Sequence, residues 1–120
     1  MKERHDILTA YIGDKDPHLW LQGEGKSILM PVLLKTAQEV VFDNLEEKQA
    51  ARIEAQIRGN IKAFDFWVRF HNIEETLEKI MEWALNMEEY ETCQEVKYLQ
   101  DYVNDLKNTL SDTEKTRMGR

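Results

Sequence analysis

Apolar residues recur at intervals of three and four along residues 72–110 of this 120-residue chain. Alternating intervals of three and four are typical of two helices that pack nearly antiparallel along one seam. Residues 87–91, between the two halves, are enough to form a turn, so the pattern predicts an antiparallel helical hairpin. Five apolar side chains are expected to be buried along its seam: Leu77, Ile80, Val96, Leu99 and Val103.

A second apolar pattern runs through residues 45–70, with large apolar side chains four, four, three and four residues apart. On a helix these positions fall within an arc of about 80°. They are Ile53, Ile57, Ile61, Phe64 and Val68. The pair Gly59-Asn60 interrupts the pattern, either as the end of one helix and the start of another or as a weak point in a single helix. We favour one continuous helix.

The remaining segments also predict helices: a short one over residues 2–12, and a longer one that starts near Ser27 or Pro31 and runs to about Asn44. Four side chains of the longer helix should be buried: Leu33, Ala37, Val40 and Val41. Residues 18–22 fit either a helical turn or a strand-like segment. No segment gives a confident strand. We therefore expect an all-α fold, a bundle of four to five helices in one domain, 1–110, that ends in the hairpin 72–110, followed by a flexible polar tail, 111–120.

Composition narrows the classes of function. The chain is 42% hydrophobic and 32% charged, as is ordinary for a soluble globular protein. Its longest apolar run, residues 28–34, is far shorter than the roughly 20 residues of a membrane span, and its charged N-terminus is unlike a signal peptide. A single cysteine, Cys93, cannot form an internal disulfide. These features predict a cytoplasmic protein.

The formal net charge of −7 is unevenly distributed. Residues 74–95 hold eight glutamates and one lysine, so this segment alone carries −7. Residues 48–69 hold five basic and two acidic side chains, or +3. Because phosphate binding needs a net basic surface, nucleic acid is disfavoured as a partner.

One candidate site is a glycine-rich stretch, residues 23–27, before a predicted helix. Glycines, a lysine and a serine at a helix N-terminus can bind an anion through backbone N–H groups, the helix dipole and a cation. The stretch lacks the glycine that a full phosphate-binding loop has five positions before Gly25, where this chain has Trp20. A plain flexible loop is the main alternative to a weak anion site at Gly25, Lys26 and Ser27.

A second candidate is an aromatic-basic face on the predicted helix 45–70. On a continuous helix the face collects three basic and three aromatic side chains: Arg58, Lys62, Arg69, Phe66, Trp67 and Phe70. Another helix could cover it, a ring-shaped ligand could stack on it, or a protein could dock there. Because one neighbour cannot cover both sides of a helix, we expect a homodimer through Phe66, Trp67 and Phe70.

A third candidate is the acidic turn of the hairpin, with Glu88, Glu89 and Glu91. Such a run is either a solvated surface or a docking surface for a basic protein, steered by charge. The three histidines are scattered, with no spacing typical of a metal site, and Cys93 has no evident histidine partner. We therefore expect no metal, no cofactor and no enzymatic activity.

Part of the hairpin resembles a known module. The relevant residues are Leu77-Glu78-Lys79-Ile80-Met81, Ala84, Glu89-Tyr90-Glu91, Cys93 and Glu95-Val96-Lys97. With this pattern, residues 77–103 resemble the UVR motif, although Lys97-Tyr98 stands where that motif has Arg-Asp. The motif is a helical hairpin of excision-repair subunits and of regulators of a bacterial protease chaperone, so the resemblance implies a role in protein–protein contact.

These observations favour a non-enzymatic helical interaction protein: a regulator, inhibitor or adaptor of a kind common among small phage proteins. It would dock through the acidic hairpin and the aromatic-basic face. The alternative is a protein that binds a small molecule or nucleotide through Phe66, Phe70 and the Lys26 loop.

Overall fold

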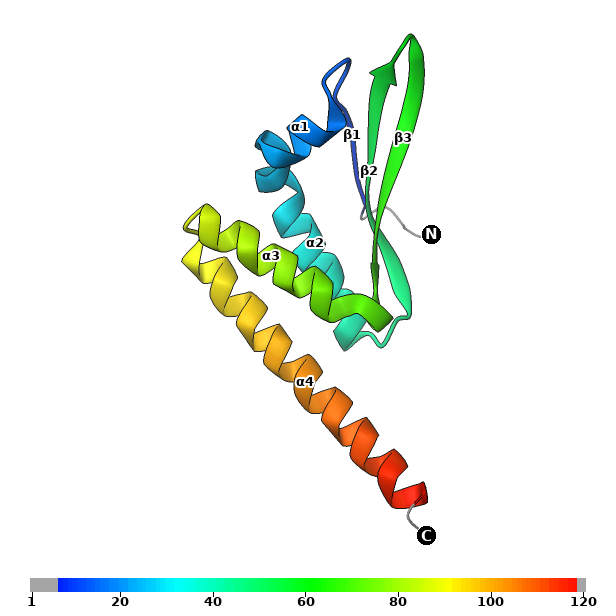
Figure 1. Cartoon of the computed structure of the whole chain (residues 1–120), viewed down its shortest axis with the longest axis vertical. Coiled ribbons are helices and arrows are strands. Elements are labelled where there is room, and N and C mark those ends of the chain that lie inside the picture. Colours follow the sequence, from blue (N-terminus) through cyan, green and yellow to red (C-terminus); the bar gives the residue numbers. More distant parts are fainter. Residues whose placement is uncertain (1–6, 119–120) are drawn as a thin grey trace.

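The chain folds around a three-stranded sheet, so the prediction of an all-α bundle of four to five helices is wrong. The computed structural model describes residues 7–118, with side chains described as far as residue 109. Strand β1 is parallel to β2, and β3 is antiparallel to β2, in the spatial order β1-β2-β3 (Figure 1). The elements are β1 (Leu8–Tyr11), α1 (Pro17–Gln22), α2 (Glu24–Phe42), β2 (Glu47–Ile57), β3 (Asn60–Arg69), a 3-10 turn (Phe70–Asn72), α3 (Ile73–Asn86) and α4 (Tyr90–Met118).

The largest correction concerns residues 45–70, where the predicted helix is a β-hairpin. In β2 the buried residues Ala51, Ile53 and Ala55 alternate with polar residues, the period of two expected for a strand with one covered face. A spacing of four, such as that between Ile53 and Ile57, fits both a helix and every second position of a strand. The aromatic residues of β3 favour a strand on a half-buried surface.

The turn between these strands consists of Arg58 and Gly59, because Ile57 pairs with Asn60 across it. Arg58 has a φ of 54° and Gly59 a φ of 81°. Positive φ at both central residues is the conformation whose twist matches that of paired strands in a two-residue hairpin. Gly59 therefore reverses the chain and neither ends nor weakens a helix.

Strand β1 replaces the helix predicted over residues 2–12, of which residues 2–6 lie outside the described part of the chain. Leu8 pairs with Ala51 and Ala10 with Ile53, so these two apolar side chains of β1 extend the face of the sheet that α1 and α2 cover. We call this the inner face and the opposite one the outer face. Helices α1 and α2 then carry the chain across the inner face before it returns as β2.

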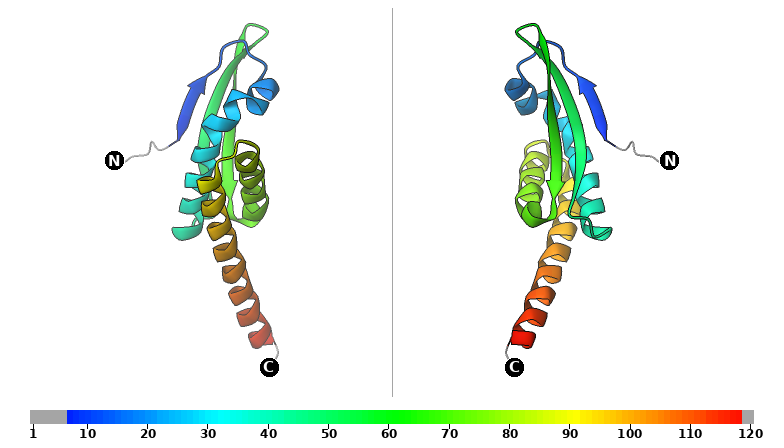
Figure 2. Two further views of the ribbon diagram at one scale, coloured as in Figure 1. Left: turned by 90° about the vertical axis from the view of Figure 1, so that its left-hand side faces the viewer. Right: turned by 90° about the vertical axis from the view of Figure 1, so that its right-hand side faces the viewer.

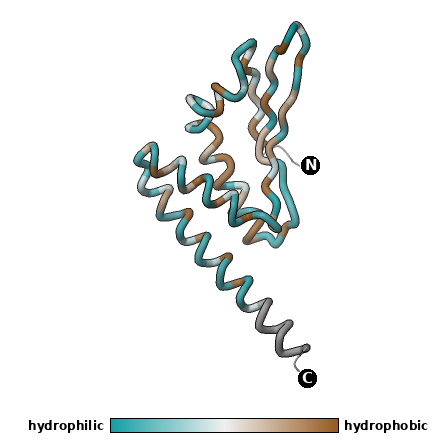
Figure 3. The backbone as a smooth tube through the Cα atoms, viewed as in Figure 1, coloured by the Kyte–Doolittle hydropathy of each residue, from teal (hydrophilic) through white to brown (hydrophobic). Residues whose placement is uncertain are grey.

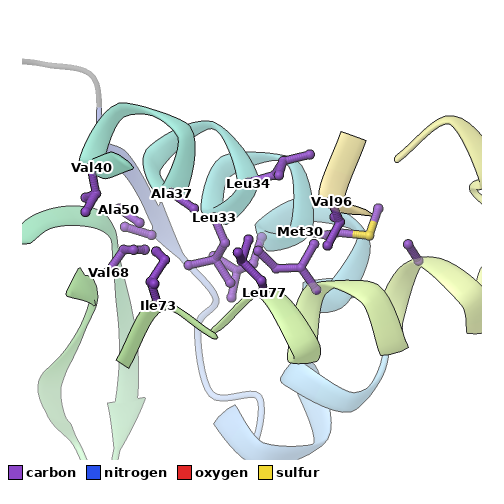
Figure 4. Close-up of a cluster of buried hydrophobic side chains, with 14 of the residues drawn as sticks. Met30, Leu33, Leu34, Ala37, Val40, Ala50, Val68, Ile73, Leu77 and Val96 are labelled. Carbon is purple, nitrogen blue, oxygen red and sulfur yellow. The ribbon is translucent and has the colours of Figure 1, made fainter. Parts of the chain in front are cut away.

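Helix α2 lies at the centre of the hydrophobic core. Leu29, Ala37 and Val40 have no exposed surface, and α2 contacts the sheet, α1 and α3. Figure 4 shows α2 side chains that meet Val68 of β3 and Leu77 of α3. The four buried positions expected on this helix are confirmed: Leu33, Ala37, Val40 and Val41.

Helices α3 and α4 pack against each other as the antiparallel pair that the apolar spacing predicts (Figures 1 and 2). The five seam side chains are buried, as expected: Leu77, Ile80, Val96, Leu99 and Val103. Helix α4 continues through residues 111–118, where we expect a polar tail, and its second half extends away from the other elements (Figure 1). In Figure 3, α2 is mostly hydrophobic, whereas α4 is mostly hydrophilic with hydrophobic residues at intervals.

Candidate interaction surface

Strand β3 has ten residues and a neighbouring strand on one side only. No other strand of residues 7–118 pairs with its second edge, which faces away from β2 (Figure 2). Natural proteins usually keep edge strands short or otherwise protected, because unpaired N–H and C=O groups attract another strand. In β3, by contrast, three large apolar side chains are more than a third exposed: Ile61 at 57%, Phe64 at 37% and Trp67 at 41%.

Hydrogen bonds on the far side of β2 show which backbone groups of β3 are free. The Ile12 N–H donates to the Glu54 carbonyl (2.9 Å), and the Gln56 N–H donates to the Gly13 carbonyl (2.6 Å). Backbone groups alternate in direction along a strand, so the N–H and C=O groups of residues 54 and 56 point to β1 and not to β3. Ala63 is paired with Glu54, so the N–H and C=O of Ala63 point to the free edge, as do those of its odd-numbered neighbours.

Apolar surface borders this edge on the inner side. A hollow of about 190 Å³ lies between α1 and the strands β2 and β3. A more open hollow of about 340 Å³ lies between β3 and α3 and shares Leu21 and Phe66 with the first. Six apolar side chains line most of the smaller hollow: Trp20, Leu21, Ile53, Ile57, Phe64 and Phe66. A chain that paired with β3 would therefore find apolar space for its own side chains.

The outer face of the sheet differs, because ion pairs cross it. Arg52 contacts Glu54 at 3.2 Å and Asp65 at 3.3 Å, and Arg69 contacts Glu47 at 2.9 Å. Exposed pairs of this kind contribute little stability each. Each of these charged side chains does have a partner of opposite charge, in contrast to the unpaired backbone groups of the β3 edge.

The residues of the predicted aromatic-basic face are spread over both faces of a hairpin, since they do not lie on a helix, although Phe66 and Trp67 both line the larger hollow. Phe66 lies on the inner face, whereas Trp67 and Arg69 lie on the outer face, with the guanidinium carbon of Arg69 5.8 Å from the Trp67 ring centroid. Phe70 follows β3, and its ring centroid is 5.6 Å from Nζ of Lys107. The two other basic residues lie at or near the hairpin tip: Arg58 and Lys62.

The acidic turn lies between α3 and α4, with Glu88, Glu89 and Glu91 exposed. Glu88 has a φ of 57°, and the Glu89 N–H donates to the Ala84 carbonyl at 2.9 Å. The turn therefore closes without a glycine and presents its carboxylates to solvent.

Gly25, Lys26 and Ser27 lie in the first turn of α2 and not in a loop before a helix. A Cβ atom on Gly25 would be 2.6 Å from a ring carbon of Trp20, so this glycine allows α1 and α2 to approach closely. The Ser27 hydroxyl donates to the Glu24 carbonyl at 2.9 Å. Packing therefore accounts for Gly25, and Glu24 places a negative charge in the same helical turn.

Two further findings apply to the described residues only. Among them, no group of three histidine, cysteine, aspartate or glutamate side chains is arranged to hold a metal ion. None of the helices is both long and apolar enough to cross a membrane.

No protein-family model matches the chain, and no curated protein or solved structure matches it either. The resemblance of residues 77–103 to the UVR motif therefore rests on those residues alone. The functional interpretation therefore depends on the surface features described above.

The helix predicted over residues 45–70 does not reveal the free edge or the exposure of Ile61 and Phe64. A signal for them was present. Apolar residues alternate with polar ones through residues 51–57, and after Gly59 a second run places Phe64, Phe66 and Val68 at every second position.

Proposed function

We propose that the protein is a non-enzymatic protein–protein interaction module, a cytoplasmic regulator, inhibitor or adaptor. Its main docking surface would be the free edge of β3 with the apolar side chains beside it. The observation that carries this proposal is the ten-residue unpaired edge next to one apolar hollow and a second hollow with a mixed apolar and polar lining. Strand addition at such an edge gives affinity through main-chain hydrogen bonds, and adjacent pockets for alternate side chains give specificity.

Site-specific photo-crosslinking in the native host tests the proposal. A photoreactive amino acid at position 63, whose backbone groups point to the free edge, should form a defined covalent adduct with a strand of another chain. The matched control is the same amino acid at exposed Lys35 on α2, which should form none. Equal labelling from both positions, or no adduct at position 63, would contradict the proposal.

The acidic turn is proposed as a second docking surface, for a basic partner. Glu88, Glu89 and Glu91 belong to the segment that carries a charge of −7, and all three are exposed. If charge steers the encounter, the association rate with a lysine-rich peptide should fall sharply between low and physiological ionic strength. Stopped-flow fluorescence measures this rate. A rate independent of salt would remove the acidic turn from the proposal.

A second candidate function is the binding of a small apolar molecule. The observation in its favour is the hollow of about 190 Å³, which is lined almost entirely by apolar side chains. A thermal-shift screen of apolar metabolites tests it, because a ligand at 100 times its dissociation constant stabilises a protein by about 2.7 kcal/mol. No shift across the screen would leave the interaction module as the preferred function.

A further inference from the structure

We propose that the occupant of the β3 edge is a second copy of this chain. The two β3 strands would pair antiparallel across a two-fold axis at Phe64, so that two three-stranded sheets join into one of six strands. This inference rests on the proposed function, because it requires the free edge of β3 to be the docking surface.

Symmetry and charge together select the register. A two-fold axis perpendicular to the sheet joins inner face to inner face, so even-numbered residues of β3 must oppose even-numbered ones. Full overlap of Asn60–Arg69 puts the centre of the pairing at Phe64 or at Asp65. A centre at Asp65 places two like carboxylates directly opposite each other, which is destabilising. A centre at Phe64 avoids this contact.

In the register centred on Phe64, Ile61 and the aromatic side chains of β3 meet apolar or cationic ones. Phe64 lies opposite itself on the inner face, beside the smaller hollow. Ile61 of one copy lies opposite Trp67 of the other on the outer face, and Lys62 lies opposite Phe66 on the inner face. Aromatic and apolar cross-strand pairs stabilise a sheet, and a cation over a ring is attracted to it. The side chains of β3 that are exposed in one copy would thus find partners.

Charges beyond the paired strands are also complementary in this register. When residue 60 of one copy pairs with residue 68 of the other, the hairpin tip with Arg58 lies next to the start of α3. The first turn of α3 contains the acidic residues Glu74 and Glu75, both exposed, of which Glu74 is paired with Lys107 of the same copy at 3.3 Å. A basic tip on each copy would therefore approach an acidic helix N-terminus on the other, twice in one symmetric dimer.

Cysteine crosslinking tests the register. Even-numbered residues of β3 direct their backbone groups to β2, so Phe64 would form a non-hydrogen-bonded pair with itself, with Cα atoms about 4.5 Å apart. That separation is compatible with a disulfide. In a Cys93→Ser background, oxidised Phe64→Cys should become a covalent dimer, whereas Asp65→Cys, its matched control, should not. Efficient crosslinking of Asp65→Cys alone would overturn the register.

Light scattering on the full chain tests the dimer itself. The wild type should be a dimer at micromolar concentration. Ala63→Pro removes an edge N–H without affecting the bonds to β2, and it should weaken the dimer about tenfold or more. Ala63→Val, the matched control, should stay dimeric, and circular dichroism checks that both variants fold.

A wild type that is monomeric at micromolar concentration would overturn the dimer. The proposed function would survive that result if photo-crosslinking at position 63 still yields an adduct with a different protein. A dimer that is indifferent to Ala63→Pro would show that the copies associate elsewhere, which also overturns the inference.

Discussion

The two hairpins of this protein differ in what they leave unpaired. In the α3–α4 hairpin, backbone hydrogen bonds are made within each helix, and the seam is closed: Leu77, Ile80 and Val96 are fully buried. In the β2–β3 hairpin, the described residues 7–118 bond only one edge of β3, and Ile61 and Trp67 remain exposed.

From this difference we infer separate roles, with the helical hairpin stabilising the fold and the strand hairpin binding another chain. The helical hairpin buries its seam side chains within the chain, and its exposed surface combines many carboxylates with Leu85 and three tyrosines. The strand hairpin completes only half of its pairing in one copy and offers apolar side chains beside free backbone groups. The comparison predicts that changes in the helical seam alter folding and that changes at the β3 edge alter association.

The largest expected effect is on the helical seam. Leu99 is 1% exposed, so Leu99→Ala leaves a cavity and should lower the free energy of unfolding by about 2–5 kcal/mol. Tyr98→Ala is the matched control, because Tyr98 is 65% exposed on the same helix and should have a small effect. Urea unfolding at one fixed protein concentration measures both. Similar losses for the two variants would mean that the seam does not hold the helices together.

A smaller effect on stability is expected at the contact between α1 and α2. Helix α1 also forms one wall of the smaller hollow. Gly25→Ala would place a Cβ atom 2.6 Å from Trp20, so the helices must shift, at a cost of about 1–3 kcal/mol. Ser27→Ala, in an exposed position of the same turn, should stay within about 0.5 kcal/mol of the wild type. A neutral Gly25→Ala variant would show that α1 packs less closely than the structure indicates.

The smallest effect is expected at the strand turn. Gly59 has a φ of 81°, which a residue with a side chain rarely adopts, so Gly59→Ala should destabilise the protein by about 1–2 kcal/mol. Arg58→Asn should slightly stabilise it, because asparagine tolerates the φ of 54° found there. Thermal unfolding of both variants measures the two shifts. Shifts of the same sign would contradict the two-residue turn.

The sequence predicts the helical hairpin well, because a spacing of alternating three and four over residues 73–110 fits no strand. It fails over residues 45–70 because Ile53 and Ile57, four residues apart, satisfy both periods. The alternation becomes clear only when the small residues Ala51 and Ala55 are included among the apolar positions. The acidic turn can be predicted from residues 87–91 alone. The β3 edge does not, because which strand lies at an edge depends on pairing between distant segments, Leu8–Tyr11 with β2 among them.

Amide hydrogen exchange along β3 at low and high protein concentration tests the central claim most directly. We expect the N–H groups of Ile61, Ala63 and Asp65 to exchange rapidly in dilute solution and to become protected as the protein concentration rises. Those of Lys62 and Phe64, which bond to β2, should be protected at every concentration. Rapid exchange at the odd-numbered positions at all concentrations would contradict pairing of β3 with a second copy, and uniform protection in dilute solution would contradict the free edge itself.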